Sequence, residues 1–203
     1  MPQILGSGIK TQNLFRFFLL KEILMRRLKP FVSALTFLSL LLLLATTARA
    51  ENVSATLYLA TDTGNGDEIG IVTFADDKDG VTITTDLKGL APGKHGFHVH
   101  EKPDCSPAEK DGKMGHALAA GGHFDPDKTG KHLGPEGGGH KGDLPVLTVS
   151  EDGTAKTTLK VKGIKAADFK NRSLMIHEGG DNYSDTPAVL GGGGNRIACG
   201  IIK

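Results

Sequence analysis

The chain has 203 residues, a formal net charge of +1 and no tryptophan. Residues 1–50 contribute seven Lys and Arg and one Glu, so residues 51–203 carry 17 basic and 22 acidic side chains, a net charge of −5. A mildly acidic segment of this length with no basic stripe suits a single domain, and it argues against a nucleic-acid-binding protein.

The N-terminal fifty residues have the pattern of a secretory signal. Residues 25–29 form a short basic stretch, residues 31–45 are apolar, and Ala48-Arg49-Ala50 is a small-x-small cleavage site. The apolar run is shorter than the ~20 residues that a membrane-spanning helix needs. We therefore expect cleavage after Ala50, with a retained membrane anchor as the alternative.

The start of this signal divides the N-terminal region in two. Met25 would begin a signal of ordinary length. We therefore interpret residues 25–50 as the signal proper and residues 1–24 as an upstream extension that the cell does not use. Residues 51–203 then form the mature domain.

Eight short segments alternate apolar and polar side chains between turn residues, which is typical of strands. Asp79-Gly80 predicts a hairpin between the second and third segments, and Asp152-Gly153 predicts one between the fifth and sixth. Only residues 166–170 indicate a helical turn. Eight short strands predict an all-β sandwich or closed barrel. The segments are residues 53–59, 69–74, 81–87, 96–100, 146–149, 157–161, 174–177 and 196–202.

Two long segments, about residues 101–144 and 178–195, lack the strand pattern and are rich in Gly. Loops of this length are uncommon in compact domains unless they are functional or tied down. The two cysteines, Cys105 and Cys199, predict one disulfide in an exported protein, with two free thiols as the alternative. A bridge that closes so large a loop contributes about 4–5 kcal/mol in the chain-entropy description.

All eight histidines fall between His95 and His177, and six of them have spacings that suit metal ligation. His98 and His100 are two residues apart in a predicted strand, so their rings project to one face about 7 Å apart. His177 ends a separate strand and can complete a nitrogen-rich site with this pair. A four-nitrogen, nearly planar site favours Cu(II).

A second set of ligands comes from one loop, in the pattern His123-x8-His132-x7-His140-x2-Asp143. Three nitrogens and a carboxylate oxygen with no open position are typical of a structural zinc site. His123 is the first of these residues and the nearest to the strand pair, so it is the candidate for a ring shared by both ions. A shared imidazolate can take up a proton when one of the two metals is reduced.

Several segments, in the same order along the chain, closely resemble copper,zinc superoxide dismutases, and some resemble the bacterial periplasmic branch. The resemblance covers essentially all of residues 51–203. It implies an eight-stranded, immunoglobulin-like Greek-key barrel or sandwich with two functional loops. It also implies dismutation of superoxide to oxygen and hydrogen peroxide. The segments are Gly96-Phe97-His98-Val99-His100-Glu101, Asp104-Cys105, His123-Phe124-Asp125-Pro126, Gly142-Asp143-Leu144, Leu174-Met175-Ile176-His177, Gly179-Gly180-Asp181-Asn182 and Gly194-Asn195-Arg196-Ile197-Ala198-Cys199-Gly200.

The resemblance also implies roles for individual residues, with one copper and one zinc ion per subunit. Asp181 matches a carboxylate that fixes one copper and one zinc histidine. Arg196 matches an arginine that holds a small anion beside the copper. Cys105 and Cys199 match the family disulfide. The copper ligands match His98, His100, His123 and His177, and the zinc ligands match His123, His132, His140 and Asp143.

His123 and Arg196 are therefore the expected catalytic residues, His123 as the proton carrier and Arg196 as the anion anchor. Because the mature domain is net negative, fast capture of an anion needs a locally positive approach. Lys102, Lys110 and Lys113, on the loop that carries Cys105, are the candidates for this steering.

Two histidines remain outside this scheme: His95 matches a structural position that bonds to backbone, and His116 has no assigned role. We expect a periplasmic enzyme whose partner is superoxide, with no nucleic acid, no membrane contact after signal cleavage, and either a monomeric or a homodimeric state. A periplasmic metal carrier and a zinc-only structural relative are the alternatives. Asp181 and Arg196 argue against the carrier, and the four filled copper positions argue against the zinc-only relative.

Overall fold

The structure is a computed structural model that describes residues 20–22, 26 and 52–203. Apart from residue 26, the expected signal lies outside the described residues, as do its cleavage site after Ala50 and most of residues 1–24. In the described parts of the chain, no helix combines the length and the apolar character that a bilayer crossing requires.

Within residues 52–203, short strands dominate and helical structure is limited to 3-10 turns. The turns are η1 (Leu118–Ala120), η2 (Ala166–Phe169) and η3 (Val189–Gly192). The strands are β1 (Asn52–Thr61), β2 (Gly64–Asp76), β3 (Gly80–Leu87), β4 (Gly93–His95), β5 (Phe97–His100), β6 (Ala108–Lys110), β7 (Lys113–Gly115), β8 (Leu147–Val149), β9 (Ala155–Lys162), β10 (Ser173–His177) and β11 (Arg196–Ile201).

All eight predicted strands are present, and η2 lies at the predicted helical turn. The sequence pattern does not reveal β4, β6 and β7, because three residues are too few for an alternation to show. The two long loops contain only short elements: β6, β7 and η1 in the first, and η3 in the second.

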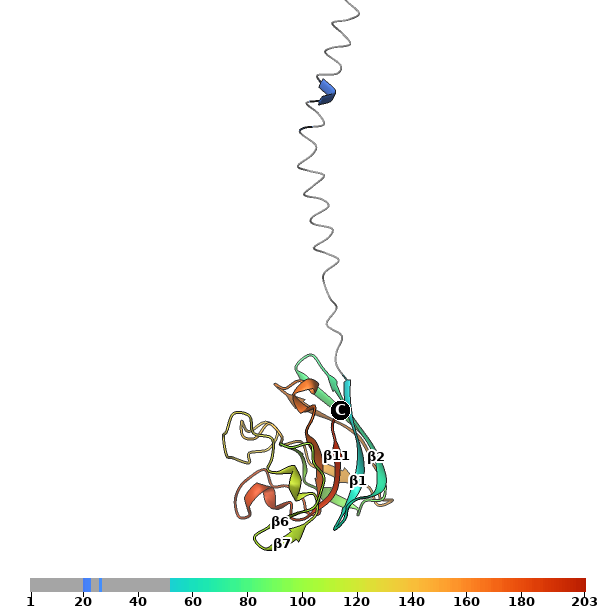
Figure 1. Ribbon diagram of the computed structural model, residues 1–203, viewed down its shortest axis with the longest axis vertical. Coiled ribbons are helices and arrows are strands. Elements are labelled where there is room, and N and C mark those ends of the chain that lie inside the picture. The colour runs from blue at the N-terminus through green and yellow to red at the C-terminus, as the bar shows by residue number, and fades with distance from the viewer. Residues whose placement is uncertain (1–19, 23–25, 27–51) are drawn as a thin grey trace, which may run out of the picture. The chain divides into compact units, whose positions relative to one another are not determined.

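Seven strands form one strongly curled antiparallel sheet in the order β5-β10-β11-β1-β2-β3-β9, and two small sheets pair β4 with β8 and β6 with β7. β1, β2 and β11 lie side by side in Figure 1. β1, β2 and β3 follow one another as a meander, and β11 returns along β1, the type of connection found in Greek-key folds. The predicted all-β architecture is confirmed.

One predicted pairing is wrong. The turn at Asp152-Gly153 forms, with the Gly153 N–H donating to the Ser150 carbonyl at 2.9 Å, but the strands on its two sides do not pair with each other. Instead, β8 pairs with β4, and β9 pairs with β3 along its whole length. Turn residues specify where the chain reverses but not which strands pair, and here the two strands on either side of the turn join different sheets.

The core follows from the alternation within the strands. In β1, Val53, Ala55 and Leu57 are buried, and the residues between them are exposed or partly exposed. Phe74 of β2 packs against Phe169 of η2, with ring centroids 5.4 Å apart. Each such side chain stabilises the fold by about 1.5–3 kcal/mol through burial. The sheet is thus a rigid support for the loops.

Candidate metal centre

β5 is buried on both of its faces, as is its neighbour β10. Phe97 and Val99 belong to the apolar core, so His98 and His100 project from the opposite face, as the sequence predicts. On one side of this strand lies β10, with Met175 opposite His98.

Loop backbone covers the other edge of β5. The Val99 N–H donates to the Gly142 carbonyl and the Phe124 N–H donates to the Val99 carbonyl, both at 2.8 Å. These bonds create isolated bridges that place Asp143 beside His98 and His123 beside His100. The first long loop is therefore attached to the strand at the positions where its candidate ligands leave the backbone.

The four predicted copper ligands come together. One ligand atom from each of these histidines lies within 4.8 Å of the others, and all four residues are buried. The rings of His98 and His123 stack at a centroid distance of 4.0 Å. The residues of this first cluster are His98, His100, His123 and His177.

The predicted zinc ligands gather around the carboxylate of Asp143. Its Oδ1 lies 2.9 Å from His123 Nδ1 and 3.4 Å from His140 Nδ1, and its Oδ2 lies 3.0 Å from His132 Nδ1. The ring of His98 stacks on that of His123. One ligand atom of His98 also lies within 4.8 Å of ligand atoms of His123, His132 and Asp143. His123 is the residue that faces Asp143 with one ring nitrogen and the first cluster with the other.

Unpaired polar atoms show that these residues suit metal ions. A buried polar atom without a hydrogen bond costs about 1–3 kcal/mol, so such atoms are rare unless something else satisfies them. Seven occur among the described residues, and each belongs to a candidate ligand. In the described ranges these atoms are His98 Nδ1, His100 Nε2, His123 Nε2, His132 Nδ1, His140 Nδ1, Asp143 Oδ2 and His177 Nε2.

The second ring nitrogen of most of these histidines is held by the protein. His100 Nδ1 donates to the Gly121 carbonyl at 2.9 Å, and His177 Nδ1 lies 3.3 Å from the Gly194 carbonyl. Hydrogen bonds of this kind fix the orientation and tautomer of a metal-binding histidine. The free nitrogens therefore point into the clusters as lone pairs, which is the form that binds a cation.

The carboxylate of Asp181 links a histidine of the first cluster to a histidine of the second. Its Oδ2 accepts from His98 Nε2 and its Oδ1 accepts from His132 Nε2, both at 2.7 Å. The backbone of Gly191 passes close to the carboxylate of Asp181. A Cβ on Gly191 would lie 2.0 Å from Asp181 Oδ1, and the φ of Gly191 is +73°. This position requires glycine.

Burial and the nearby carboxylates shift the pKa values of the cluster histidines in different directions. Burial lowers the pKa of His123 to about 4 and that of His177 to about 3, so both rings are neutral and ready to bind at pH 7. Burial also acts to lower the pKa of His132, but the carboxylates of Asp143 and Asp181 outweigh it and raise this pKa to about 9. A metal ion at His132 must therefore displace a proton.

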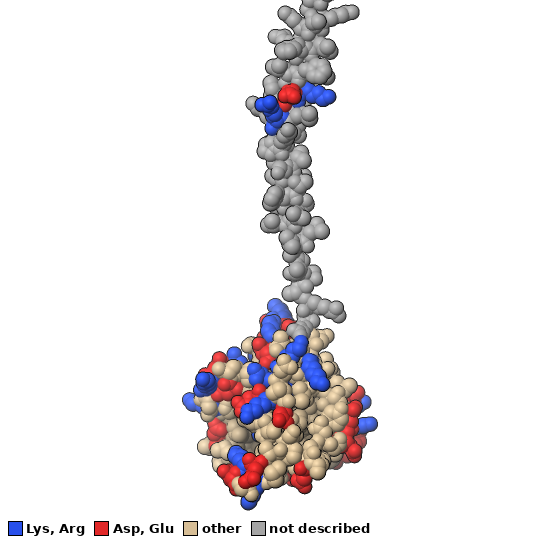
Figure 2. Space-filling model, viewed as in Figure 1, with Lys and Arg blue, Asp and Glu red and all other residues tan. Residues whose placement is uncertain are grey.

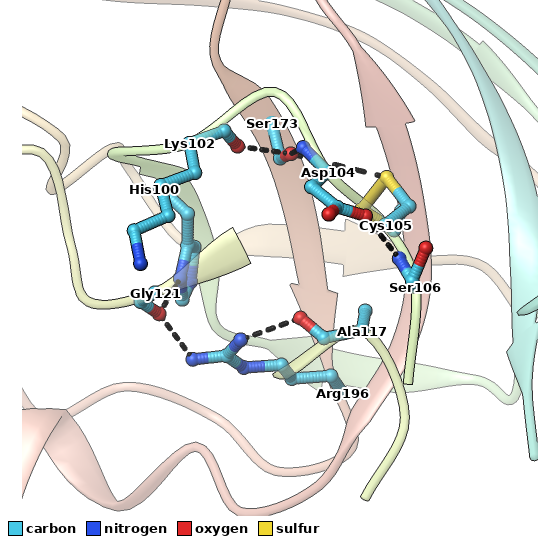
Figure 3. Close-up of a disulfide and its surroundings, with 10 residues drawn as sticks. His100, Lys102, Asp104, Cys105, Ser106, Ala117, Gly121, Ser173 and Arg196 are labelled. Carbon is cyan, nitrogen blue, oxygen red and sulfur yellow. Dashed lines mark hydrogen bonds between the residues drawn. A yellow bond between two sulfur atoms is a disulfide. The ribbon is translucent and has the colours of Figure 1, made fainter. Parts of the chain in front are cut away.

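Arg196 lies beside the first cluster and is held by the first loop (Figure 3). Its two terminal nitrogens donate to the carbonyls of Ala117 and Gly121, both at 2.6 Å. The Gly121 carbonyl also accepts from His100 Nδ1, so one oxygen joins Arg196 to the cluster. Burial lowers the pKa of Arg196 to about 10, which leaves it charged at neutral pH.

The predicted disulfide between Cys105 and Cys199 is confirmed, with its Cα atoms 5.8 Å apart. Ser173 of β10 reinforces the attachment, since its hydroxyl donates to the Lys102 carbonyl at 2.6 Å and accepts from the Asp104 N–H at 3.1 Å. The bridge and Ser173 tie the first loop to β10 and β11. This attachment holds the two carbonyls that position Arg196.

A pocket of about 820 Å³ opens beside Arg196. Lys110 and Lys113, from the β6–β7 hairpin, line it, whereas Lys102 does not. His116 also lines this pocket, and its Nε2 lies 2.9 Å from Asp62 Oδ1. His95, which does not line this pocket, faces backbone with both ring nitrogens. Its Nδ1 lies 2.7 Å from the His177 carbonyl, and its Nε2 lies 2.9 Å from the Ala91 carbonyl.

Sequence reasoning misses several residues that hold the second loop. Asp185 accepts from the backbone N–H groups of His132 and Leu190, and the Tyr183 hydroxyl accepts from the Val146 N–H. No spacing motif could have revealed these contacts, because each joins segments far apart in the chain or depends on the path of an irregular loop.

Comparison with known proteins identifies the family. The sequence profile described as copper/zinc superoxide dismutase (SODC) matches residues 68–202. The chain belongs to this family. The superoxide dismutase [Cu-Zn] of Brucella abortus biovar 1 (strain 9-941) is 50% identical over 173 residues, which is 85% of this chain and 100% of that protein. The enzyme of Escherichia coli (strain K12) is 51% identical over 165 residues, or 81% of this chain and 95% of the relative.

Solved structures of copper,zinc superoxide dismutases are similar in fold to this chain. The Cu/Zn superoxide dismutase from Brucella abortus superposes with a TM-score of 0.74 at 52% identity, covering 75% of this chain and 100% of that one. The solution structure of the monomeric copper, zinc enzyme from Salmonella enterica gives 0.67 at 51% identity over the same shares. The chain is thus an enzyme that converts superoxide to oxygen and hydrogen peroxide with copper and zinc, and a histidine bridges its two metal sites.

Proposed function

We propose that the two clusters divide the metals between them as follows. Copper is held by His98, His100, His123 and His177, and zinc by His123, His132, His140 and Asp143. The seven unpaired buried atoms carry this assignment, because they comprise one free atom on each ligand, and His123 faces one cluster with each nitrogen. Four imidazoles favour copper, and three imidazoles with a carboxylate in a closed set favour zinc.

Bound copper supplies the one-electron acceptor and donor that the two half-reactions with superoxide require. Arg196 binds the substrate anion, because its two bonds to carbonyls use only two of the five N–H donors of a guanidinium. The remaining donors and the positive charge attract superoxide to the pocket beside the first cluster.

His123 is the proton carrier in this scheme. Its Nε2 is the unpaired atom on the side of the first cluster, while Nδ1 stays with the Asp143 side. Reduction of superoxide to hydrogen peroxide consumes two protons, of which Nε2 delivers one and water the other. Asp181 acts as a positioning residue that keeps the rings of His98 and His132 in orientation.

Lys110 and Lys113 are the proposed steering residues, since they line the pocket that contains Arg196. Figure 2 shows basic and acidic side chains interspersed over the face in view, without a broad positive area. Because residues 51–203 carry a net charge of −5, attraction of the anion depends on positive charges near the pocket. Lys102, the third candidate, has no supporting contact with the pocket.

The proposed location is the periplasm, with residues 1–24 as an unused extension, residues 25–50 as a cleaved signal and residues 51–203 as the enzyme. The signal pattern and the disulfide support this, because disulfides persist in oxidising compartments. N-terminal sequencing of the protein from a periplasmic extract should give Glu51 as the first residue. A mature N-terminus well before Ala45 would contradict the signal.

The proposed site needs no second subunit, since its ligands and Arg196 all come from one chain. A homodimer would leave this chemistry unchanged. Light scattering on a size-exclusion column distinguishes the two states by mass.

The test of the proposed site is metal analysis together with a superoxide-decay assay. We expect one copper and one zinc per chain and rapid decay of superoxide. Protein that holds both metals and does not react with superoxide would indicate a metal carrier instead.

A further inference from the structure

A second pocket, of about 410 Å³, lies on the zinc side of the centre. Its wall consists mainly of two segments, residues 134–141 of the first loop and residues 161–164 at the end of β9. Among the described residues, it shares no lining residue with the pocket that contains Arg196. The domain therefore has two separate pockets, one beside Arg196 and one at the zinc cluster.

This second pocket reaches the zinc cluster directly, because His140 and Asp143 line it and the four residues of the first cluster do not. His140 is also the most accessible proposed zinc ligand. Its side chain is 9% exposed, compared with 0% for His132 and for Asp143. Solvent thus approaches the zinc cluster at His140.

The loop side of the pocket is irregular and is tied to β9 only at its surface. It contains Gly134 and Gly138, whose φ values of +70° and +72° suit glycine, and it has no strand or helix of its own. Two ion pairs close the rim, Glu136 with Lys162 at 3.6 Å and Asp127 with Lys141 at 3.2 Å. All four side chains are at least 42% exposed, so these pairs hold the loop only weakly.

We propose that zinc enters and leaves through this second pocket by way of His140, separately from the path of superoxide and copper. The inference rests on the proposed zinc ligands. Asp127 and Glu136 attract the dication at the rim, and Lys141 and Lys162 balance their charge. Removal of one lysine leaves the rim net negative, whereas removal of one carboxylate leaves it net positive.

Opposite charge changes should therefore alter zinc uptake in opposite directions. We would strip the full chain of metal with a chelator and then follow binding of zinc ions by competition with a chromogenic zinc indicator. One unit charge acts on a dication at about 10 Å in water strongly enough to change the rate about three- to fourfold. We expect Lys162→Gln to accelerate uptake by this factor at low salt, and Glu136→Gln to slow it by a similar factor.

Matched controls separate this path from general surface charge. Lys156 and Asp86 form an equally exposed ion pair on the main sheet at 3.0 Å, so Lys156→Gln and Asp86→Asn should leave zinc uptake unchanged. Copper uptake, measured in the same samples, should not respond to Lys162→Gln or Glu136→Gln. High salt should remove the differences in zinc uptake.

The outcomes distinguish failure of the path from failure of the zinc site. If zinc binds but its uptake rate is the same in Glu136→Gln, Lys162→Gln and the unaltered protein, the proposed path is wrong. If Lys113→Gln at the other pocket changes zinc uptake instead, zinc follows the substrate path. If zinc does not bind at all, the proposed zinc ligands are wrong as well.

Discussion

The two metal clusters are built in different ways. In the first, His98 and His100 belong to β5 and His177 ends β10, so backbone pairing within the main sheet sets their positions. In the second, His132, His140 and Asp143 come from an irregular loop. Their positions depend on side-chain contacts such as those of Asp181 and Asp185. The strand-borne cluster is thus positioned by the fold, whereas the loop-borne cluster needs additional attachments.

The largest expected effect comes from the strand-borne cluster. His177→Ala should lose copper and fall to the background rate of superoxide decay, while zinc and the β-sheet circular dichroism are retained. The reason is that His177 contributes to the first cluster alone and lies at the end of its strand. Lys156→Gln, which alters an exposed side chain of the main sheet outside both clusters and both pockets, is the control and should keep both metals and full activity. Unchanged activity in His177→Ala would refute the assignment of the copper site.

The attachment of the first loop should have the next largest effect. Replacement of Cys105 and Cys199 by serine removes the bridge and should lower the free energy of unfolding by about 2–4 kcal/mol. Activity should also fall, because the carbonyls of Ala117 and Gly121 that hold Arg196 lie on the released loop. Urea denaturation of the oxidised protein and of the double variant measures the difference. Equal midpoints would show that the loop holds its place without the bridge.

Asp181→Ala compares the two clusters most directly. Loss of a carboxylate that orients a metal-binding histidine typically costs 10–100-fold in affinity, as an order-of-magnitude estimate. We expect zinc to weaken by about this factor and copper by less. His132 lies on a loop, whereas His98 is also held by the pairing of β5 with β10. Competition with chelators of known affinity measures both metals in one sample, and equal weakening would contradict the distinction between the clusters.

The smallest expected effect concerns the approach of superoxide. Lys110→Gln with Lys113→Gln should lower the rate of superoxide decay severalfold at low salt and flatten its salt dependence, because both lysines line the Arg196 pocket. Lys102→Gln, outside that lining, should have little effect. A rate and salt dependence that are unaltered in the double variant would rule out steering by this hairpin.

The sequence predicts the local features and the disulfide correctly. Alternation over seven residues is enough to place β1, and the spacing His98-x-His100 in a strand is enough to put two rings on one face. Cys105 and Cys199 form the predicted bridge because the domain has no other cysteine with which either could pair.

What the sequence does not predict depends on distant contacts. The partner of β8 is β4, from more than fifty residues earlier in the chain, rather than its neighbour β9. Ser173 and Asp185 act through hydrogen bonds to backbone that folding brings from other parts of the chain. Neither residue type is unusual in a strand or a loop, so no local pattern distinguishes them.

The carbonyl of Gly121 links His100 of the first cluster to Arg196 through one peptide group. It accepts from both His100 and Arg196, so the spacing between a cluster histidine and the guanidinium is set by a main-chain atom. A side-chain replacement cannot delete a peptide oxygen. Replacement of His100 or Arg196 removes a donor, whereas the acceptor can be disturbed only by redirecting the chain, as a Cβ on Gly121 would favour because its φ is +78° and the Glu101 carboxylate lies 2.3 Å from that position. The distance between His100 and Arg196 therefore depends on the course of the backbone at Gly121, which a comparison of side chains alone would overlook.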